Sequence, residues 1–133
     1  MPRILLVEDN EFNRDMLSRR LTRAGYEVVC AGDGPQGVHM AGEAKPDLVL
    51  MDVALGAMDG WEATRLIHAT TGLRTLPIIA LTAYALESDR RRSVEVGCCD
   101  FDTKPVDLAR LISKIKRHLA PTPGLGGESP IAS

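Results

Sequence analysis

The sequence of 133 residues has no excess of positive charge, no long apolar run and few cysteines. Its 16 basic and 18 acidic residues give a net charge of −2, which argues against a nucleic-acid-binding surface. No apolar run approaches the roughly 18–20 residues of a membrane span, and the N-terminus does not read as a signal peptide. Three cysteines, two of them adjacent, do not make a disulfide framework. The composition therefore predicts a cytoplasmic protein without a nucleic-acid or membrane partner.

Short apolar segments alternate with segments of helical periodicity. The pattern predicts strands at 3–8, 26–31, 47–52, 76–82 and 99–104, and helices at about 11–24, 35–44, 61–69, 86–96 and 107–119. Strands that are apolar throughout and joined by helices indicate a parallel sheet covered on both faces, which is a doubly wound α/β fold.

Composition divides the chain into two parts. Residues 1–119 are predicted to form one domain, and residues 120–133 a flexible tail, because that segment holds three prolines and three glycines in 14 residues. In the helix at 11–24, apolar residues recur at helical spacing, namely Phe12, Met16, Leu17, Leu21 and Ala24.

Polar side chains stand at the carboxyl ends of the predicted strands, where doubly wound sheets bind their ligands. Glu8 and Asp9 end the first strand, Asp52 the third, Thr82 the fourth and Lys104 the fifth. Three carboxylates gathered at one edge repel one another. They suit a hard divalent cation such as Mg²⁺, which offsets that repulsion.

The lysine is not a metal ligand, so it needs an anion of its own. A carboxylate that accepts a phosphoryl group supplies one, since phosphoryl transfer requires a metal and cationic groups around the transferred oxygens. Asp52, alone at the end of the central strand, is the candidate acceptor. Lys104 and the hydroxyl of Thr82 are the candidates for holding the phosphoryl oxygens.

Five stretches together resemble response-regulator receiver domains, the phosphoacceptor units of two-component signalling. They are ILLVEDN, DLVLMD, MDGWE, PIIALTA and GCCDFDTKP, which fall in order and at family spacing over about residues 1–119. VEDNEFNR is similar to receivers of hybrid kinases and of single-domain regulators. The resemblance implies a flavodoxin-like (βα)5 fold with strand order 2-1-3-4-5.

The resemblance also assigns the metal ligands. It implies that Mg²⁺ is held by Asp9, Asp52 and the backbone carbonyl of Ala54, while Glu8 acts mainly through water. One departure from the family pattern lies beside this site: Leu55-Gly56 stands where the family usually has Met-Pro or Leu-Pro. We expect the missing proline to loosen the loop without changing the chemistry.

A switch follows from the same resemblance. Thr82 and Phe101 are implied to be the switch pair, which reshapes a partner-binding surface on the helix at 86–96, the strand at 99–104 and the last helix. The Lys104–Pro105 peptide bond is implied to be cis. The only reaction expected is phosphorylation and dephosphorylation of the chain's own Asp52, so the protein is not an enzyme in the usual sense.

The resemblance implies two kinds of protein partner. A histidine kinase or histidine phosphotransfer protein would donate the phosphoryl group from phosphohistidine, and a downstream protein would read the result. Nothing after residue 119 suggests an output domain, which favours a stand-alone receiver. A receiver cut from a hybrid kinase is the alternative, and the start at Met1 weighs against it.

Three other functions compete with this interpretation. GDGPQG at 32–37 matches the dinucleotide motif G-x-G-x-x-G, but Pro35 removes a helix N–H and Asp33 adds negative charge where a pyrophosphate would dock. A phosphatase of the haloacid dehalogenase type would need D-x-D after the first strand, where this chain has Glu8-Asp9-Asn10. A degenerate receiver that binds partners without phosphate would not need the complete set of site residues.

Overall fold

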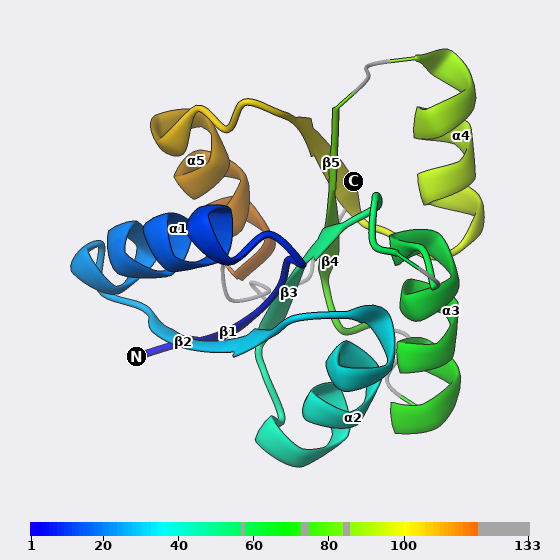
Figure 1. Cartoon of the computed structure of the whole chain (residues 1–133), viewed down its shortest axis with the longest axis horizontal. Coiled ribbons are helices and arrows are strands. Elements are labelled where there is room, and N and C mark those ends of the chain that lie inside the picture. Colours follow the sequence, from blue (N-terminus) through cyan, green and yellow to red (C-terminus); the bar gives the residue numbers. More distant parts are fainter. Residues whose placement is uncertain (57, 73–74, 84–85, 120–133) are drawn as a thin grey trace, which may run out of the picture.

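The computed structural model describes residues 1–56, 58–72, 75–83 and 86–119 (Figure 1). Five strands alternate with five helices over these residues: β1 (Arg3–Val7), α1 (Glu11–Arg23), β2 (Glu27–Ala31), α2 (Gly34–Ala44), β3 (Leu48–Asp52), α3 (Gly60–Thr71), β4 (Ile78–Thr82), α4 (Glu87–Glu95), β5 (Asp100–Thr103) and α5 (Leu108–Leu119). The predicted alternation is confirmed. The predicted tail at 120–133 lies outside the described residues.

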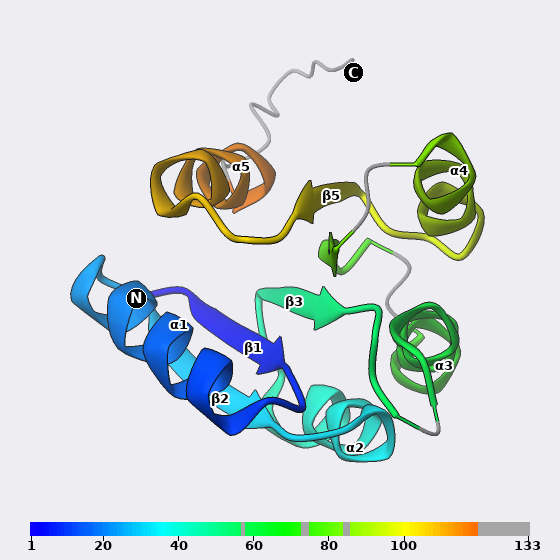
Figure 2. The ribbon, with the colours of Figure 1, turned by 45° about the horizontal axis from the view of Figure 1, so that its top comes forward.

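The strands form one parallel sheet in the order β2-β1-β3-β4-β5, as predicted. Helices α1 and α5 cover one face of the sheet, and α2, α3 and α4 lie on the other side (Figures 1 and 2). Among the described residues, no helix has both the length and the apolar character that crossing a bilayer requires.

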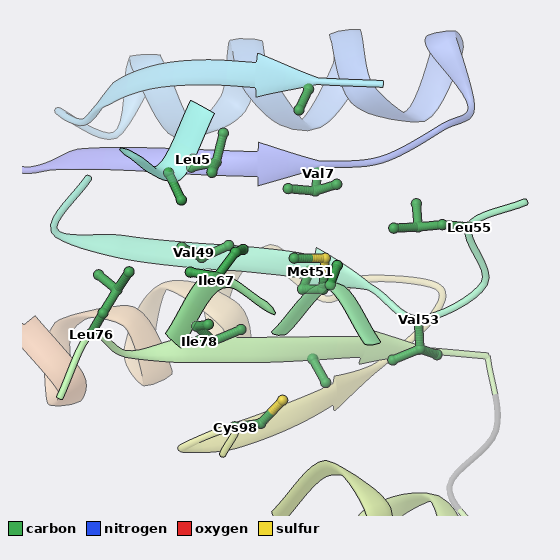
Figure 3. Packing of buried hydrophobic residues seen from close by; sticks show 14 residues of the cluster. Leu5, Val7, Val49, Met51, Val53, Leu55, Ile67, Leu76, Ile78 and Cys98 are labelled. Carbon is green, nitrogen blue, oxygen red and sulfur yellow. The ribbon is translucent and has the colours of Figure 1, made fainter. Parts of the chain in front are cut away.

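Alternate strand residues face opposite sides of the sheet and build two cores. Leu5 and Val7 of β1 belong to the cluster under α2 and α3, which Figure 3 shows with Ile67 of α3 in it. Ile4 and Leu6 belong to the cluster under α1 and α5. Because both faces are covered, β3 and β4 are buried at every residue, which explains their apolar sequences.

The helix predicted at 11–24 is confirmed as α1, but its apolar residues do not all face the core. Leu17 and Leu21 of α1 are buried, but Phe12 is 73% exposed and Met16 is 37% exposed. At about 100° per residue, Phe12 lies about 140° around the helix from Leu17, so it cannot reach the sheet. The apolar residues of α1 therefore form a narrow buried stripe and a separate exposed surface.

Candidate functional site

The carboxyl ends of four parallel strands bring the five predicted polar residues to one edge of the sheet. Asp52 and Thr82 are the last residues of β3 and β4, while Glu8, Asp9 and Lys104 follow β1 and β5. Glu8, Asp52 and Thr82 are buried, each with 3% exposure or less. These side chains are therefore held by the sheet rather than by solvent-exposed loops.

The three acids form a cluster that can hold a cation. Glu8, Asp9 and Asp52 each offer a carboxylate oxygen, and these oxygens lie within 4.8 Å of one another. Asp9 is exposed while the other two are buried, so the cluster has a side that faces solvent. Among the described residues, this is the single group of three or more acidic, histidine or cysteine side chains with such spacing. Its all-oxygen donor set fits Mg²⁺.

Lys104 lies between two of these carboxylates. Its Nζ atom is 3.1 Å from Oε1 of Glu8 and 3.1 Å from Oδ2 of Asp52. Burial opposes the charge of the ammonium, but the carboxylates of Asp52 and Glu8 outweigh it and raise the pKa of Lys104. The lysine therefore remains a cation directly beside the candidate acceptor.

Glu8 is fixed from several directions. Its Oε2 accepts a hydrogen bond from the backbone N–H of Asn10 at 3.1 Å, and its backbone carbonyl accepts one from Nη1 of Arg14 at 2.9 Å. Burial, together with the nearby charge of Asp52, raises the pKa of Glu8 although Asn10 and Lys104 oppose the shift. The sequence predicted Asn10 as the cap of α1, which is confirmed, but it did not predict these two contacts with Glu8, although Asn10 and Arg14 both lie in VEDNEFNR.

The segment after Asp52 is tied back to it. Oδ1 of Asp52 accepts a hydrogen bond from the N–H of Ala54 at 3.1 Å, and Gly60 donates its N–H to the carbonyl of Val53 at 3.1 Å. A Cβ atom on Gly60 would collide with the backbone carbonyl of Asp52, so only glycine fits at the start of α3. Leu55, which precedes Gly56 where the family usually has proline, is 2% exposed within the core.

The predicted switch residues lie on neighbouring strands. Thr82 is buried at the end of β4, and its carbonyl accepts a hydrogen bond from the N–H of Lys104 at 2.8 Å. The half-buried ring of Phe101 packs against the core, with the guanidinium of Arg90 4.9 Å and the ammonium of Lys114 5.6 Å from its centroid. The Lys104–Pro105 peptide bond is cis, the isomer that the resemblance implies.

Comparison with known proteins decides the family. Residues 4–116 match the response regulator receiver domain. The chain belongs to this family. A curated relative, the polar-differentiation response regulator DivK of Brucella anthropi, is 36% identical over 90% of this chain and 98% of its own length.

Solved structures agree with this assignment. Chemotaxis protein CheY4 of Vibrio cholerae superimposes with a TM-score of 0.85 at 29% identity, covering 90% of this receiver and 99% of that chain. The receiver domain of sensor histidine kinase PA1611 of Pseudomonas aeruginosa gives a TM-score of 0.82 at 40% identity, covering 90% and 98%. That structure has a magnesium ion coordinated in its active site cleft.

In the glycine-rich turn of this receiver, residues 32–37, side chains of the turn itself accept hydrogen bonds from its backbone N–H groups. The carboxylate of Asp33 caps α2 by accepting the N–H of Gln36, and the side chain of Gln36 accepts the N–H of Gly32. Pro35 stands at the beginning of the helix. The N–H groups of Gly32, Gln36 and Gly37 are therefore bonded within the turn and Pro35 has none, in agreement with the argument from sequence against a dinucleotide site.

Proposed function

We propose that the protein is a phosphoacceptor of two-component signalling that receives a phosphoryl group from phosphohistidine onto Asp52. The observation that carries this proposal is the position of Lys104, 3.1 Å from Oδ2 of Asp52 at the edge of a three-carboxylate cluster. The donor is a histidine kinase or a histidine phosphotransfer protein. The three cysteines are unpaired, which suits a reducing compartment, and we place the reaction in the cytoplasm.

The reaction forms one bond and breaks another. A carboxylate oxygen of Asp52 attacks the phosphorus atom, the P–N bond of the donor breaks, and the imidazole leaves with the electron pair. Asp52 thereby becomes an acyl phosphate. Lys104, which already pairs with the acceptor carboxylate, stays close enough to neutralise the transferred oxygens, and the hydroxyl of Thr82 donates a hydrogen bond to one of them.

Asp9, Asp52 and the backbone carbonyl of Ala54 would hold Mg²⁺, with Glu8 contributing through water. When bound, the ion neutralises charge on the transferred phosphoryl oxygens. The donor chemistry of the cluster supports this set, and the hydrogen bond from Ala54 to Asp52 keeps the acceptor and the following residues together. Glu8 is already engaged with Lys104 and Asn10, which supports an indirect role for it.

An apolar surface beside the site suits a protein donor. Asn13, Met16 and Leu17 of α1 line one side of a pocket next to Lys104, and Pro105 and Leu108 line the other. The exposed ring of Phe12 lies on the same helix. Leu17 is buried, whereas Phe12, Met16 and Pro105 are exposed, and exposed apolar side chains beside a reactive group are typical of interaction surfaces. We infer that the phosphohistidine protein docks here.

A second surface would carry the output. Phe101 of β5 contacts Arg90 of α4 and Lys114 of α5, so a movement of this ring changes the surroundings of both helices. A downstream protein that binds the surface of α4, β5 and α5 would read that change. The phosphoryl group need only favour one of two ring positions to shift their populations.

The test is labelling with acetyl phosphate and Mg²⁺, followed by intact-mass measurement. We expect the wild-type chain to gain one phosphoryl group, Asp52→Asn to gain none, and EDTA to abolish labelling, because an amide cannot form an acyl phosphate. Asp15→Asn, which removes an exposed aspartate of α1, is the matched control and should label fully. Labelling of Asp52→Asn at another residue would refute the assignment.

A further inference from the structure

Helix α4 packs on the protein without burying a large apolar side chain of its own. Of its nine residues, Ser93 is the buried one, and its one aliphatic side chain, Val94, is 68% exposed. By contrast, α5 buries Leu111 and Ile115 in the core. Because α4 buries no large apolar side chain, hydrophobic burial does little to fix its position.

Polar and cation–π contacts fix the position of α4 instead. The guanidinium of Arg92 lies 4.6 Å from the centroid of the Trp61 ring on α3, and Nε1 of Trp61 donates a hydrogen bond to Oγ of Ser93 at 3.0 Å. Arg92 also lies 3.9 Å from the carboxylate of Asp59. On its other side, α4 contacts β5 through Arg90, which stacks on Phe101. Such contacts are individually weak, so small changes at the two rings can move the helix.

Trp61 is linked to the carboxylate site through backbone contacts at the start of α3. It follows Gly60, whose N–H is bonded to the carbonyl of Val53 and whose Cα packs against the carbonyl of Asp52 without room for a Cβ. The side chain of Asp59 caps the same helix by accepting the N–H of Glu62 at 2.8 Å. A shift of the segment after Asp52 therefore moves the first turn of α3, and Trp61 with it.

We propose that Trp61 is a positioning residue that couples the phosphorylation site to α4 through Ser93 and Arg92. This inference rests on the proposed function and adds a second route to α4, separate from the one through Thr82 and Phe101. Coupling of this kind is reciprocal: if occupancy of the site shifts α4, then a change in the contacts of α4 must change the affinity of the site.

The experiment measures affinity for beryllium fluoride with Mg²⁺, the beryllium fluoride standing in for the phosphoryl group, on the full chain by NMR titration. The variants are Trp61→Phe, which keeps a ring but removes the N–H donor, and Arg92→Ala. Arg91→Ala is the matched control, since it removes the adjacent exposed arginine of the same helix. We expect each of the first two variants to change the affinity by at least about threefold and to alter the shift of the α4 amides on binding, while the control matches wild type.

The outcomes separate the two proposals. Failure of the wild-type chain to label at Asp52 overturns the proposed function. If the wild type labels but Trp61→Phe and Arg92→Ala bind beryllium fluoride like Arg91→Ala, the coupling through Trp61 is wrong, even if either variant has a lower Tm. A structural role alone would lower the Tm and leave the affinity unchanged. Arg92 is exposed, so its variant tests the proposal if Trp61→Phe fails to fold.

Discussion

Nζ of Lys104 lies 3.1 Å from Oε1 of Glu8, a residue 96 positions earlier in the chain. This pair explains how a buried apolar strand can end in two acids. Within the protein itself, Lys104 supplies the first positive charge that meets the carboxylate cluster, and Mg²⁺ would supply the second. Lys104 and a bound Mg²⁺ would share the carboxylate of Asp52, so the stability of the fold and the affinity for metal should depend on one another.

Lys104→Met should destabilise the protein. It leaves Glu8 and Asp52 buried without their shared cation. We expect a loss of about 2 kcal/mol in the free energy of unfolding in EDTA, less than the ~3–5 kcal/mol of fully buried pairs because the lysine side chain keeps 26% exposure. Denaturant unfolding measures this loss of stability, and adding Mg²⁺ should restore part of it. Lys116→Met, which changes an exposed lysine of α5, is the control. Equal stability of the two variants would contradict the prediction.

The two adjacent acids should differ in metal binding. Asp9→Ala removes a proposed direct ligand and should weaken Mg²⁺ binding by about tenfold or more, whereas Glu8→Ala should have the smaller effect, because a direct ligand acts at closer range. Isothermal titration of Mg²⁺ into each variant compares them. Equal losses would show that the proposed ranking of the ligands is wrong.

Thr82→Ala should separate phosphorylation from its output. The variant keeps Asp52 and Lys104, so it should still accept phosphate, but it lacks the hydroxyl that would bond a phosphoryl oxygen. We expect smaller shifts of the α4 and β5 amides on binding beryllium fluoride. A full wild-type response in this variant would exclude the switch.

Phe101→Tyr tests the other member of the switch pair. A tyrosine hydroxyl can be anchored by water in an outward position, whereas phenylalanine lacks that anchor. We therefore expect the unphosphorylated wild-type ring to be biased inward relative to the variant. NMR of the ring and of the β5 amides without phosphate compares the two. An identical ring environment in both proteins would contradict this expectation.

Two glycines beside the site should respond differently to alanine. A Cβ on Gly60 would collide with the carbonyl of Asp52, whereas a Cβ on Gly56 has no atom within 4 Å. We expect Gly60→Ala to lower the free energy of unfolding by about 1–3 kcal/mol and to reduce labelling, while Gly56→Ala leaves both nearly unchanged. Thermal unfolding and acetyl phosphate labelling measure the two effects, and similar behaviour of the variants would refute the close approach.

The ionisation of Asp100 should make the stability of the protein depend on pH. Burial would raise its pKa, but hydrogen bonds from His118, the N–H of Phe101 and Arg117 prevail and hold the pKa below the ordinary value of 3.8. Its contribution is therefore full above about pH 4 and is lost as the pH falls through the folded-state pKa. Asp100→Asn should cost about 1 kcal/mol at pH 7, with its Tm converging on wild type in acid.

The control for this pH dependence is an exposed ion pair. Asp15 and Arg19 of α1 are 60% and 75% exposed, and an exposed pair of this kind contributes little. Asp15→Asn should therefore follow the wild-type profile of Tm against pH. A constant difference between Asp100→Asn and wild type from pH 7 down to pH 2 would contradict the argument.

Much of the site was predictable because of parallel topology. Once the strands are recognised as parallel, the residues that follow them must meet at one edge, whatever their separation in the sequence. Asp52 and Lys104 could be placed together on that basis alone. Helical spacing was less informative: it grouped Phe12 with Leu21 on α1, although the first is exposed and the second is buried, because periodicity does not tell how wide the packed stripe is.

The sequence by itself determined the alternation of elements, the sheet edge where the polar residues gather, and the family, because these follow from local periodicity and from motif order. The tertiary structure decided which groups touch. That Trp61 bonds Ser93, that Asp100 meets His118, and that Lys104 bridges two carboxylates depend on distances between elements. Those distances are set by how helices pack on a twisted sheet, a property of the whole fold that no local pattern contains.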